Sequence, residues 1–253
     1  GAPLQNWIIY YPIEKFLSRY TDCIITINEE DYNIAKSKNF KAENIKLVPG
    51  VGIDLKKFEI QTSKKKAQVR KEYGYKDQDF ILFYAAELNS NKHQDLLIKA
   101  VNILKGRIPC IKLLLAGSGP LENHYKRQVE LLGLSKNIEF LGYRKDVANL
   151  LMISDVAVAS SRREGLPVNV MEAMATGLPL VVTDIRGHRD LVKNGENGYV
   201  IKLDDIESFT NVLEKLYKST ELREKIGKKN IELIQSFSIE NVLKELEDIY
   251  KKN

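Results

Sequence analysis

The sequence is poor in the residues that build disulfides, metal sites and membrane spans. It holds two cysteines and three histidines among 253 residues, and the histidines are scattered without metal-ligand spacing. Cys23 and Cys110 stand far apart, each in or beside an apolar run, which favours free thiols over a disulfide. No signal peptide is recognisable, and no apolar run approaches the ~18 residues of a spanning helix. These absences predict a cytoplasmic protein.

The sequence also lacks a strong excess of positive or negative charge. The formal net charge is +5, and 43% of the residues are hydrophobic, as in an ordinary soluble globular protein. A modest positive balance fits an anionic small molecule or weak attraction to anionic lipid. No basic motif is interleaved with aromatic residues, so we expect no nucleic-acid partner.

From residue 80 onward, short apolar runs alternate with helical patterns. This alternation predicts β-α-β units and an α/β fold with a doubly wound, Rossmann-like parallel sheet. Ligands of such sheets bind at the carboxyl ends of the strands. Expected strands span 80–85, 111–116, 138–141, 156–159, 180–183 and 198–201, and expected helices span 92–107, 121–132, 147–152, 167–175, 204–219, 221–235 and 239–252.

The first 55 residues predict a separate strand–helix–strand unit. Strands are expected at 23–27 and 45–48, with a helix from the Asn28 cap to residue 39 between them. A unit of this size is too small to bury a good core alone. The polar, basic stretch 61–79 is interpreted as a solvated loop with a short helix.

The most informative stretch is 164–184, EGLPVNVMEAMATGLPLVVTD. Pro167 suits the first position of a helix that Gly177 ends. This helix is apolar nearly all round, so we expect it to be buried, with Glu172 in its middle. Either a core cation or a backbone N–H satisfies Glu172, or its carboxylate faces a cleft and accepts hydrogen bonds from ligand hydroxyls.

The start of the same helix offers an anion site. The N–H groups of Val168, Asn169 and Val170 and the positive end of the helix dipole suit a phosphate. Glu172 lies roughly 7 Å further along the axis than Pro167. One ligand with a diphosphate at the helix start and a ribose at Glu172 fits this offset.

These residues carry a resemblance to a known family. The spacing Glu164-x7-Glu172, inside G-L-P, E-A-M-A and G-x-P-L-V-V, resembles the E-x7-E element of retaining nucleotide-sugar glycosyltransferases of family four, also called group 1, with the GT-B fold. The resemblance implies sugar transfer with retention from a nucleotide diphosphate sugar, most commonly a UDP-sugar, without a metal ion or other cofactor. It implies that Glu164 reaches the donor sugar and that the loop Gly165, Leu166 and Pro167 belongs to the donor site.

The resemblance also assigns the loops after three earlier strands. Lys92 matches a lysine that contacts the donor phosphates, but Glu87 stands where an arginine is expected, and a carboxylate repels a diphosphate. Either Lys92 and backbone amides suffice, or Arg162, Arg163 or Arg186 substitutes, or the site is weakened. This departure makes a non-catalytic nucleotide-sugar binding module the alternative function.

The remaining assignments fall on two short loops. Gly117 and Gly119 line the nucleotide cleft in the resembled enzymes, although a tight strand-to-helix turn alone explains them. A dinucleotide-binding loop needs a third glycine where Glu122 stands, which argues against an oxidoreductase. Tyr143 or Arg144 is expected to meet the base, in a loop that Asp146 caps. His188 is expected near the same edge of the sheet and is a weak candidate for a base.

The resemblance divides the chain into three parts. Residues 1–55 correspond to the end of an acceptor-binding N-terminal domain and the hinge, residues 56–236 to the donor-binding domain, and residues 237–253 to a crossover helix. Most of the first domain therefore lies outside this sequence. The pattern is similar to bacterial exopolysaccharide and capsule enzymes, whose saccharide acceptors are lipid-linked. Such an acceptor would place the intact protein at the inner face of the plasma membrane.

Overall fold

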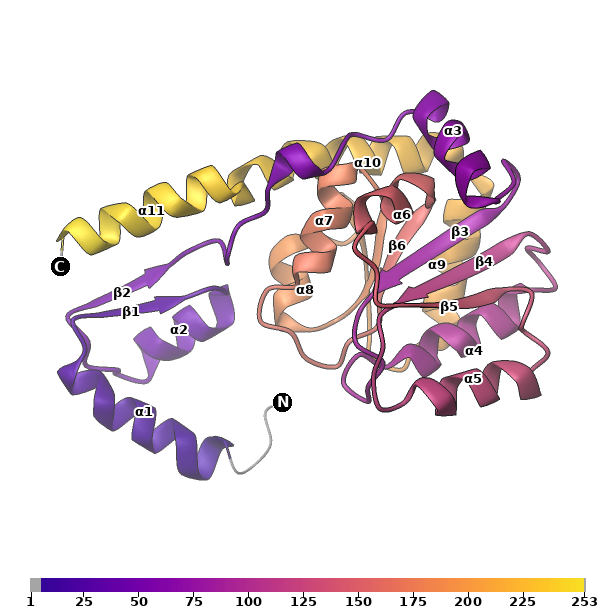
Figure 1. Ribbon diagram of the computed structural model, residues 1–253. Coiled ribbons are helices and arrows are strands. Elements are labelled where there is room, and N and C mark those ends of the chain that lie inside the picture. The colour runs from indigo at the N-terminus through magenta and orange to yellow at the C-terminus, as the bar shows by residue number, and fades with distance from the viewer. Residues whose placement is uncertain (1–5, 253) are drawn as a thin grey trace. The chain divides into compact units, whose positions relative to one another are not determined.

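The computed structural model describes residues 6–252, and their contacts form two compact units. The larger unit spans Asp54–Gln235. The smaller unit combines the residues up to Ile53 with those from Ser236 onward. Figure 1 shows the elements of both units.

The larger unit is built on a six-stranded sheet in the order β5-β4-β3-β6-β7-β8. Every neighbouring pair of strands in it is parallel, which confirms the predicted α/β fold. The strands are β3 (Phe80–Ala85), β4 (Ile111–Ala116), β5 (Ile138–Gly142), β6 (Val156–Ala159), β7 (Leu180–Thr183) and β8 (Gly198–Ile201).

Helices cover both faces of this sheet. On one face α4 packs against β4 and α9, and α9 also contacts β7 and β8; on the other face α6 packs against β3, and α7 packs against β6 and β7 (Figure 1). The helices are α3 (Ser63–Tyr73), α4 (Gln94–Leu104), α5 (Glu122–Leu131), α6 (Val147–Ile153), α7 (Val168–Thr176), α8 (Arg186–Leu191), α9 (Ile206–Lys218) and α10 (Thr220–Ile234), with a short helical turn at Leu55–Lys57.

The central strands are buried because both of their faces are covered. All residues of β6 and β7 are buried, as are all of β3 except Ala85. Continuous apolar runs are what a doubly covered parallel sheet requires. In this sheet the strand boundaries agree with expectation, except that β5 runs one residue further, whereas the two strands predicted at 23–27 and 45–48 each end one residue early. Helix α4 starts at Gln94, two residues late, because His93 takes a left-handed conformation with φ 55°.

The interpretation of residues 61–79 as a solvated loop with a short helix is wrong in one respect. The segment forms an eleven-residue helix, α3. Thr62 caps it, because the Thr62 Oγ1 atom accepts a hydrogen bond from the Lys65 N–H at 3.2 Å. Val69 and Arg70 on this helix are buried. The basic composition hid an inward-facing arginine, whose partner Asp155 lies far away in the sequence. Helix α8 was likewise not expected as a helix.

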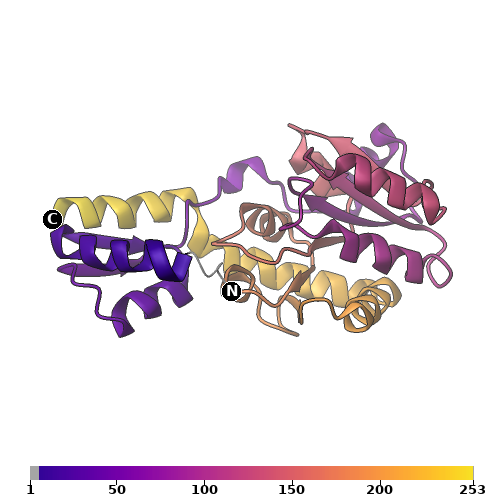
Figure 2. The same cartoon turned by 90° about the horizontal axis from the view of Figure 1, so that it is seen from below.

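The smaller unit pairs β1 (Cys23–Thr26) with β2 (Asn44–Leu47) in parallel, with α2 (Glu29–Ser37) between them in the chain. Asn28 caps α2 as predicted, accepting the Asp31 N–H at 2.8 Å. The main chain of Ile53 bonds to Phe237 and Ile239, at the start of α11 (Ile239–Lys252). Figure 2 shows α11 beside this strand pair. The remaining elements are α1 (Tyr11–Leu17) and short turns at Asn6–Tyr10, Ser18–Tyr20 and Gln235–Phe237.

Candidate functional site

Helix α7 connects β6 to β7, and it starts at the carboxyl edge of the sheet, after the loop that follows β6. Pro167 precedes it in an extended conformation, and Gly177 ends it with φ 80°. The amide of Val170 is already bonded to the Pro167 carbonyl and to the Asn169 side chain. The amides of Val168 and Asn169 have no acceptor in the part of the chain that the structure describes. Two of the three predicted N–H donors are therefore free to receive an anion.

Glu172 lies one turn further along α7 and is half-buried. Within residues 6–252 its carboxylate has neither a salt bridge nor a hydrogen-bond donor. Burial raises the pKa of Glu172, and the charge of Lys57 acts in the opposite direction. A carboxylate held in this state gains most from a ligand that supplies hydroxyl donors.

The structure brings Lys92 and Glu164 together across the carboxyl edge. The Lys92 Nζ atom lies 2.5 Å from Glu164 Oε1, and the two side chains are 23% and 14% exposed. The Ser161 hydroxyl donates to the same carboxylate oxygen at 2.6 Å. Ser160 Oγ donates to the Lys92 carbonyl at 2.7 Å, which fixes the main chain that carries the lysine. Both residues predicted to act on the donor therefore occupy one point of the sheet.

A buried tyrosine, Tyr84, contacts the serine that binds this ion pair. The Tyr84 hydroxyl and Ser161 Oγ are 2.7 Å apart. Because the Ser161 hydrogen goes to Glu164, Tyr84 is the donor in this contact. Burial raises the pKa of Tyr84, which keeps its hydroxyl neutral and able to donate. The chain from Tyr84 through Ser161 fixes the orientation of the Glu164 carboxylate.

The loop that carries Glu164 is held against α8 by a close backbone contact. A Cβ atom on Gly187 would lie 2.2 Å from the Gly165 carbonyl oxygen, so only glycine fits there. Beside it, Arg186 Nε donates to the Glu164 carbonyl at 3.1 Å. This contact places a guanidinium next to the Lys92–Glu164 pair.

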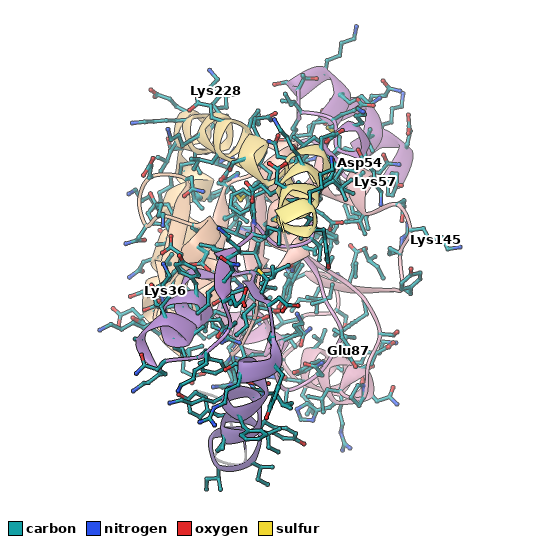
Figure 3. All side chains as sticks on the ribbon, turned by 90° about the vertical axis from the view of Figure 1, so that its left-hand side faces the viewer. Lys36, Asp54, Lys57, Glu87, Lys145 and Lys228 are labelled. Atoms are coloured by element: carbon teal, nitrogen blue, oxygen red, sulfur yellow. The ribbon has the colours of Figure 1, made fainter. Side chains whose placement is uncertain are left out.

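Of the three arginines considered as substitutes for the residue at position 87, Arg186 has the best place. Arg162 is bonded to Asp204 and to the His93 ring, and Arg163 is exposed. Glu87 itself is exposed, and its carboxylate accepts a hydrogen bond from Asn89 at 2.8 Å (Figure 3).

Gly117 and Gly119 have a structural reason to be glycine. Gly117 has φ 139°, and a Cβ atom there would lie 2.1 Å from the Ala86 carbonyl oxygen. At Gly119 a Cβ atom would lie 2.5 Å from the Leu88 oxygen. These contacts bring the loops after β3 and β4 together at the carboxyl edge. Their assignment as ligand contacts stays a prediction.

The loop after β5 carries two residues expected to meet a base. Tyr143 is 78% exposed. Arg144 binds the Asp146 carboxylate through Nε at 2.8 Å, and this bond, with a further one from Tyr73, lowers the pKa of Asp146 to about 2. The Asp146 side chain makes no helix-cap bond, so that expectation is wrong. Lys145, between them in the sequence, is exposed (Figure 3).

His188 is more deeply buried than its position in a polar segment suggested. Its Nδ1–H donates to the Thr183 carbonyl at 2.8 Å. Burial lowers the pKa of His188 to about 4, so the ring is neutral at pH 7. Its Nε2 is buried and has no partner among the described residues.

Sequence reasoning did not identify the supporting role of Tyr84, Ser161 and Thr183. The available signal was a polar residue inside or at the end of each central strand. Such residues tend to be bonded when buried, but nothing in the sequence says to what.

Within residues 6–252 no group of His, Cys, Asp and Glu side chains has the arrangement of a metal site. In the same range no helix combines the length and apolar character needed to cross a bilayer.

The comparison with protein families gives one match. Residues 65–233 match the model described as glycosyl transferases group 1. This range holds most of the larger unit, including Lys92, Glu164 and Glu172.

Two curated relatives and one solved structure illustrate what the chain resembles. EpsD of Bacillus subtilis (strain 168), which is named as a glycosyltransferase, is 43% identical over 250 residues, covering 99% of this chain and 66% of EpsD. The UDP-Gal:alpha-D-GlcNAc-diphosphoundecaprenol alpha-1,3-galactosyltransferase of Escherichia coli is 31% identical, covering 96% and 63%. The chain thus spans slightly less than two thirds of these relatives.

The solved structure is Anabaena Alr3699/HepE in complex with UDP. It superposes with a TM-score of 0.86 at 19% sequence identity, covering 95% of this chain and 66% of that one. At this identity the likeness shows a shared fold. It confirms the predicted GT-B architecture.

Proposed function

The chain belongs to the glycosyl transferases group 1 family, and we propose that it forms the donor-binding part of an enzyme that transfers a sugar, with retention, from a UDP-sugar. The observation that carries the proposal is the grouping at the carboxyl edge of the sheet. An ion pair and a helix start with two free amides lie there, and the unpartnered Glu172 follows one turn along the same helix. Together they match a ligand that has a diphosphate, a sugar and a ribose.

In this proposal Lys92 and the start of α7 bind the diphosphate. Their positive charge stabilises the negative charge that develops on the leaving diphosphate, so the chemistry requires no metal ion. Lys92 exchanges part of its contact with Glu164 for the phosphate oxygens. Arg186 adds a second cation in place of the arginine that is missing at position 87.

The two glutamates divide the sugars between them. Glu164, oriented by Ser161, accepts hydrogen bonds from the donor sugar. Glu172 accepts them from the ribose, which relieves the cost of its burial. Tyr143 and Arg144 contact the base, and the loops at Gly117 and Gly119 and at Gly165 to Pro167 complete the cleft.

The acceptor in this proposal is a lipid-linked saccharide of surface polysaccharide synthesis, bound with the help of sequence outside this chain. The E. coli relative supports it, because its name specifies a diphosphoundecaprenol-linked acceptor and a UDP-sugar donor. A lipid-linked acceptor implies that the enzyme acts at the cytoplasmic face of a membrane.

A calorimetric titration with UDP and with 2′-deoxy-UDP tests the ribose contact. We expect the unmodified chain to bind UDP more tightly than the deoxy compound. Glu172→Ala should weaken UDP binding about tenfold, because one charge-assisted hydrogen bond is lost. The variant should also bind both nucleotides equally, since the hydroxyl has lost its acceptor.

Glu207→Ala is the matched control, because Glu207 is exposed on α9, on the opposite face of the sheet from α7. It should leave both affinities unchanged. A folded Glu172→Ala chain with unaltered UDP affinity would remove Glu172 from the site. Tighter binding of GDP or ADP than of UDP would replace the proposed donor base.

A further inference from the structure

A cavity of about 610 Å³ lies at the amino edge of the same sheet, opposite the candidate site. Its walls come from α3, α10 and the residues just before β6 and β7, and all of them belong to the larger unit. Gln61 closes one side, with its Nε2 bonded to the Met152 and Ser154 carbonyls. A volume of this size is typical of small-molecule sites, which occupy roughly 300–1,000 Å³.

The charges inside this cavity do not balance. Arg70 is buried, and Lys66 and Arg223 are half-buried, so the walls contribute three cations. Asp155 is the one buried carboxylate among the described lining residues. Lys66 Nζ is 2.6 Å and Arg70 Nη2 is 2.8 Å from its two oxygens. One carboxylate against three cations leaves two positive charges without a buried counter-ion.

Burial and the excess of positive charge lower the pKa values of Lys66 and Arg223. Burial lowers the pKa of Lys66 to about 8 although Asp155 raises it, and both Arg70 and Arg223 lower it further. Burial also lowers the pKa of Arg223, and Arg70 adds to that effect while Asp155 and Glu224 oppose it. The cations repel one another in a site of reduced polarity.

Exposed charges at the cavity mouth change this balance little. Asp77 and Glu224 are exposed and acidic, and Lys228 on α10 is exposed and basic (Figure 3). Charges in contact with water are screened more strongly than buried ones. The excess inside the cavity therefore remains positive.

Hydrogen-bond donors remain available beside the excess charge. Lys66 uses two of its three donors, on the Ser154 carbonyl and on Asp155. Arg223 donates to the Leu216 and Tyr217 carbonyls and to Thr220 Oγ1, which leaves two of its five N–H bonds. Thr62 and Ser63 add hydroxyls to the wall.

We propose that this cavity is a second ligand site, which binds a small phosphate monoester. A phosphate monoester carries about −1.5 to −2 charge at pH 7 and three acceptor oxygens. It therefore matches both the two excess positive charges and the unused donors. The site is separate from the donor site because it lies at the opposite edge of the sheet.

The test uses inorganic phosphate as the probe, titrated by calorimetry into the 253-residue chain, with acetate as the monovalent comparison. We expect binding of phosphate in the millimolar range or tighter and much weaker binding of acetate. Arg223→Gln should weaken phosphate binding about tenfold or more, because a charge-assisted contact is lost. If phosphate bound only at the donor site, Lys92→Gln would abolish the binding and Arg223→Gln would not change it.

A second variant guards against loss of folding, because Arg223 also stacks on Phe80. Lys228→Glu reverses an exposed charge at the mouth and should weaken phosphate binding about twofold at low salt, because exposed charges are screened. Far-ultraviolet circular dichroism checks both variants. The proposal fails if phosphate does not bind, if folded Arg223→Gln keeps full affinity, or if the loss follows Lys92→Gln instead.

UDP titration of the same variants separates this proposal from the donor site. Arg223→Gln and Lys228→Glu should bind UDP normally. Failure of phosphate binding with normal UDP binding would overturn the second site alone.

Discussion

The two edges of the six-stranded sheet carry ion pairs of opposite design. At the amino edge, Asp155 contacts Lys66 and Arg70 and also accepts the Ile81 N–H at 2.7 Å. At the carboxyl edge, Glu164 has one cation, Lys92, and a serine hydroxyl. The first carboxylate is saturated with donors, whereas the second is bound through a single oxygen.

This difference separates a structural ion pair from one that a ligand can open. Burial alone would raise the pKa of Asp155, but Lys66 and Arg70 outweigh it and hold the pKa below its usual value. Moving both cations away would leave the buried carboxylate of Asp155 unpaired, which is expensive. Lys92 and Glu164 can instead exchange each other for phosphate and sugar oxygens. Only the carboxyl edge is built for exchange of partners.

Neutralising Asp155 and Glu164 in turn tests the difference between the two ion pairs most directly. Asp155→Asn should reduce the free energy of unfolding by about 3–5 kcal/mol, because the buried Arg70 and the half-buried Lys66 lose their counter-ion. Glu164→Gln should reduce it by about 1 kcal/mol or less, since Lys92 keeps access to water. Denaturant unfolding, followed by circular dichroism, measures both values. Equal losses would mean that the two edges do not differ in this way.

The next effect concerns the buried histidine beside the carboxyl edge. The pKa of His188 is about 4 in the folded chain, below the ordinary 6.5. The unfolded chain therefore takes up a proton first as the pH falls. This contribution to stability is complete above pH 6.5, is lost between pH 6.5 and 4, and amounts to at most about 3 kcal/mol.

His188→Gln removes this titration while an amide N–H can still reach the Thr183 carbonyl. The stability of the variant relative to the unmodified chain should therefore rise as the pH falls from 6.5 to 4. Thermal unfolding at several pH values measures it. A difference that does not change with pH would show that the pKa of His188 is the same in the folded and the unfolded chain.

Most of the fold could be predicted because buried strands and helices have apolar patterns that are visible in the local sequence. Runs such as 80–85 and 180–183 are apolar throughout, and they form strands that are covered on both faces. Helix α3 was misjudged because its burial depends on one long-range partner. Nothing near Arg70 indicates that Asp155, 85 positions later, will neutralise it.

The candidate site was predictable in its parts but not in its connections. The stretch around Pro167 and Glu172 predicts the helix and its acid, because glycine, proline and apolar spacing are local signals. That Lys92 touches Glu164, or that Tyr84 supports Ser161, depends on how separate strands align. Such contacts follow from the sheet order, which the sequence pattern alone does not determine.

The smallest expected effect tests the position where this chain departs from its family. Glu87→Arg replaces an exposed carboxylate by the cation that the resemblance leads one to expect there. If Glu87 lies near the bound diphosphate, the charge reversal should tighten UDP binding by about two- to fivefold at low salt, because exposed charges contribute little each. Calorimetric titration at low and high ionic strength measures the change, which salt should reduce.

Lys145→Glu is the matched control, since Lys145 is also exposed, on the loop after β5. If both substitutions act only through the overall charge, Lys145→Glu should weaken UDP binding by the same factor at which Glu87→Arg tightens it. A larger effect at position 87, still present at high salt, would indicate direct contact with the phosphates. No effect at position 87 would mean that Lys92, Arg186 and the amides of α7 already supply all the charge that the diphosphate needs. In that case the donor site is complete without the missing arginine, and the carboxyl edge owes its function to the Lys92–Glu164 pair.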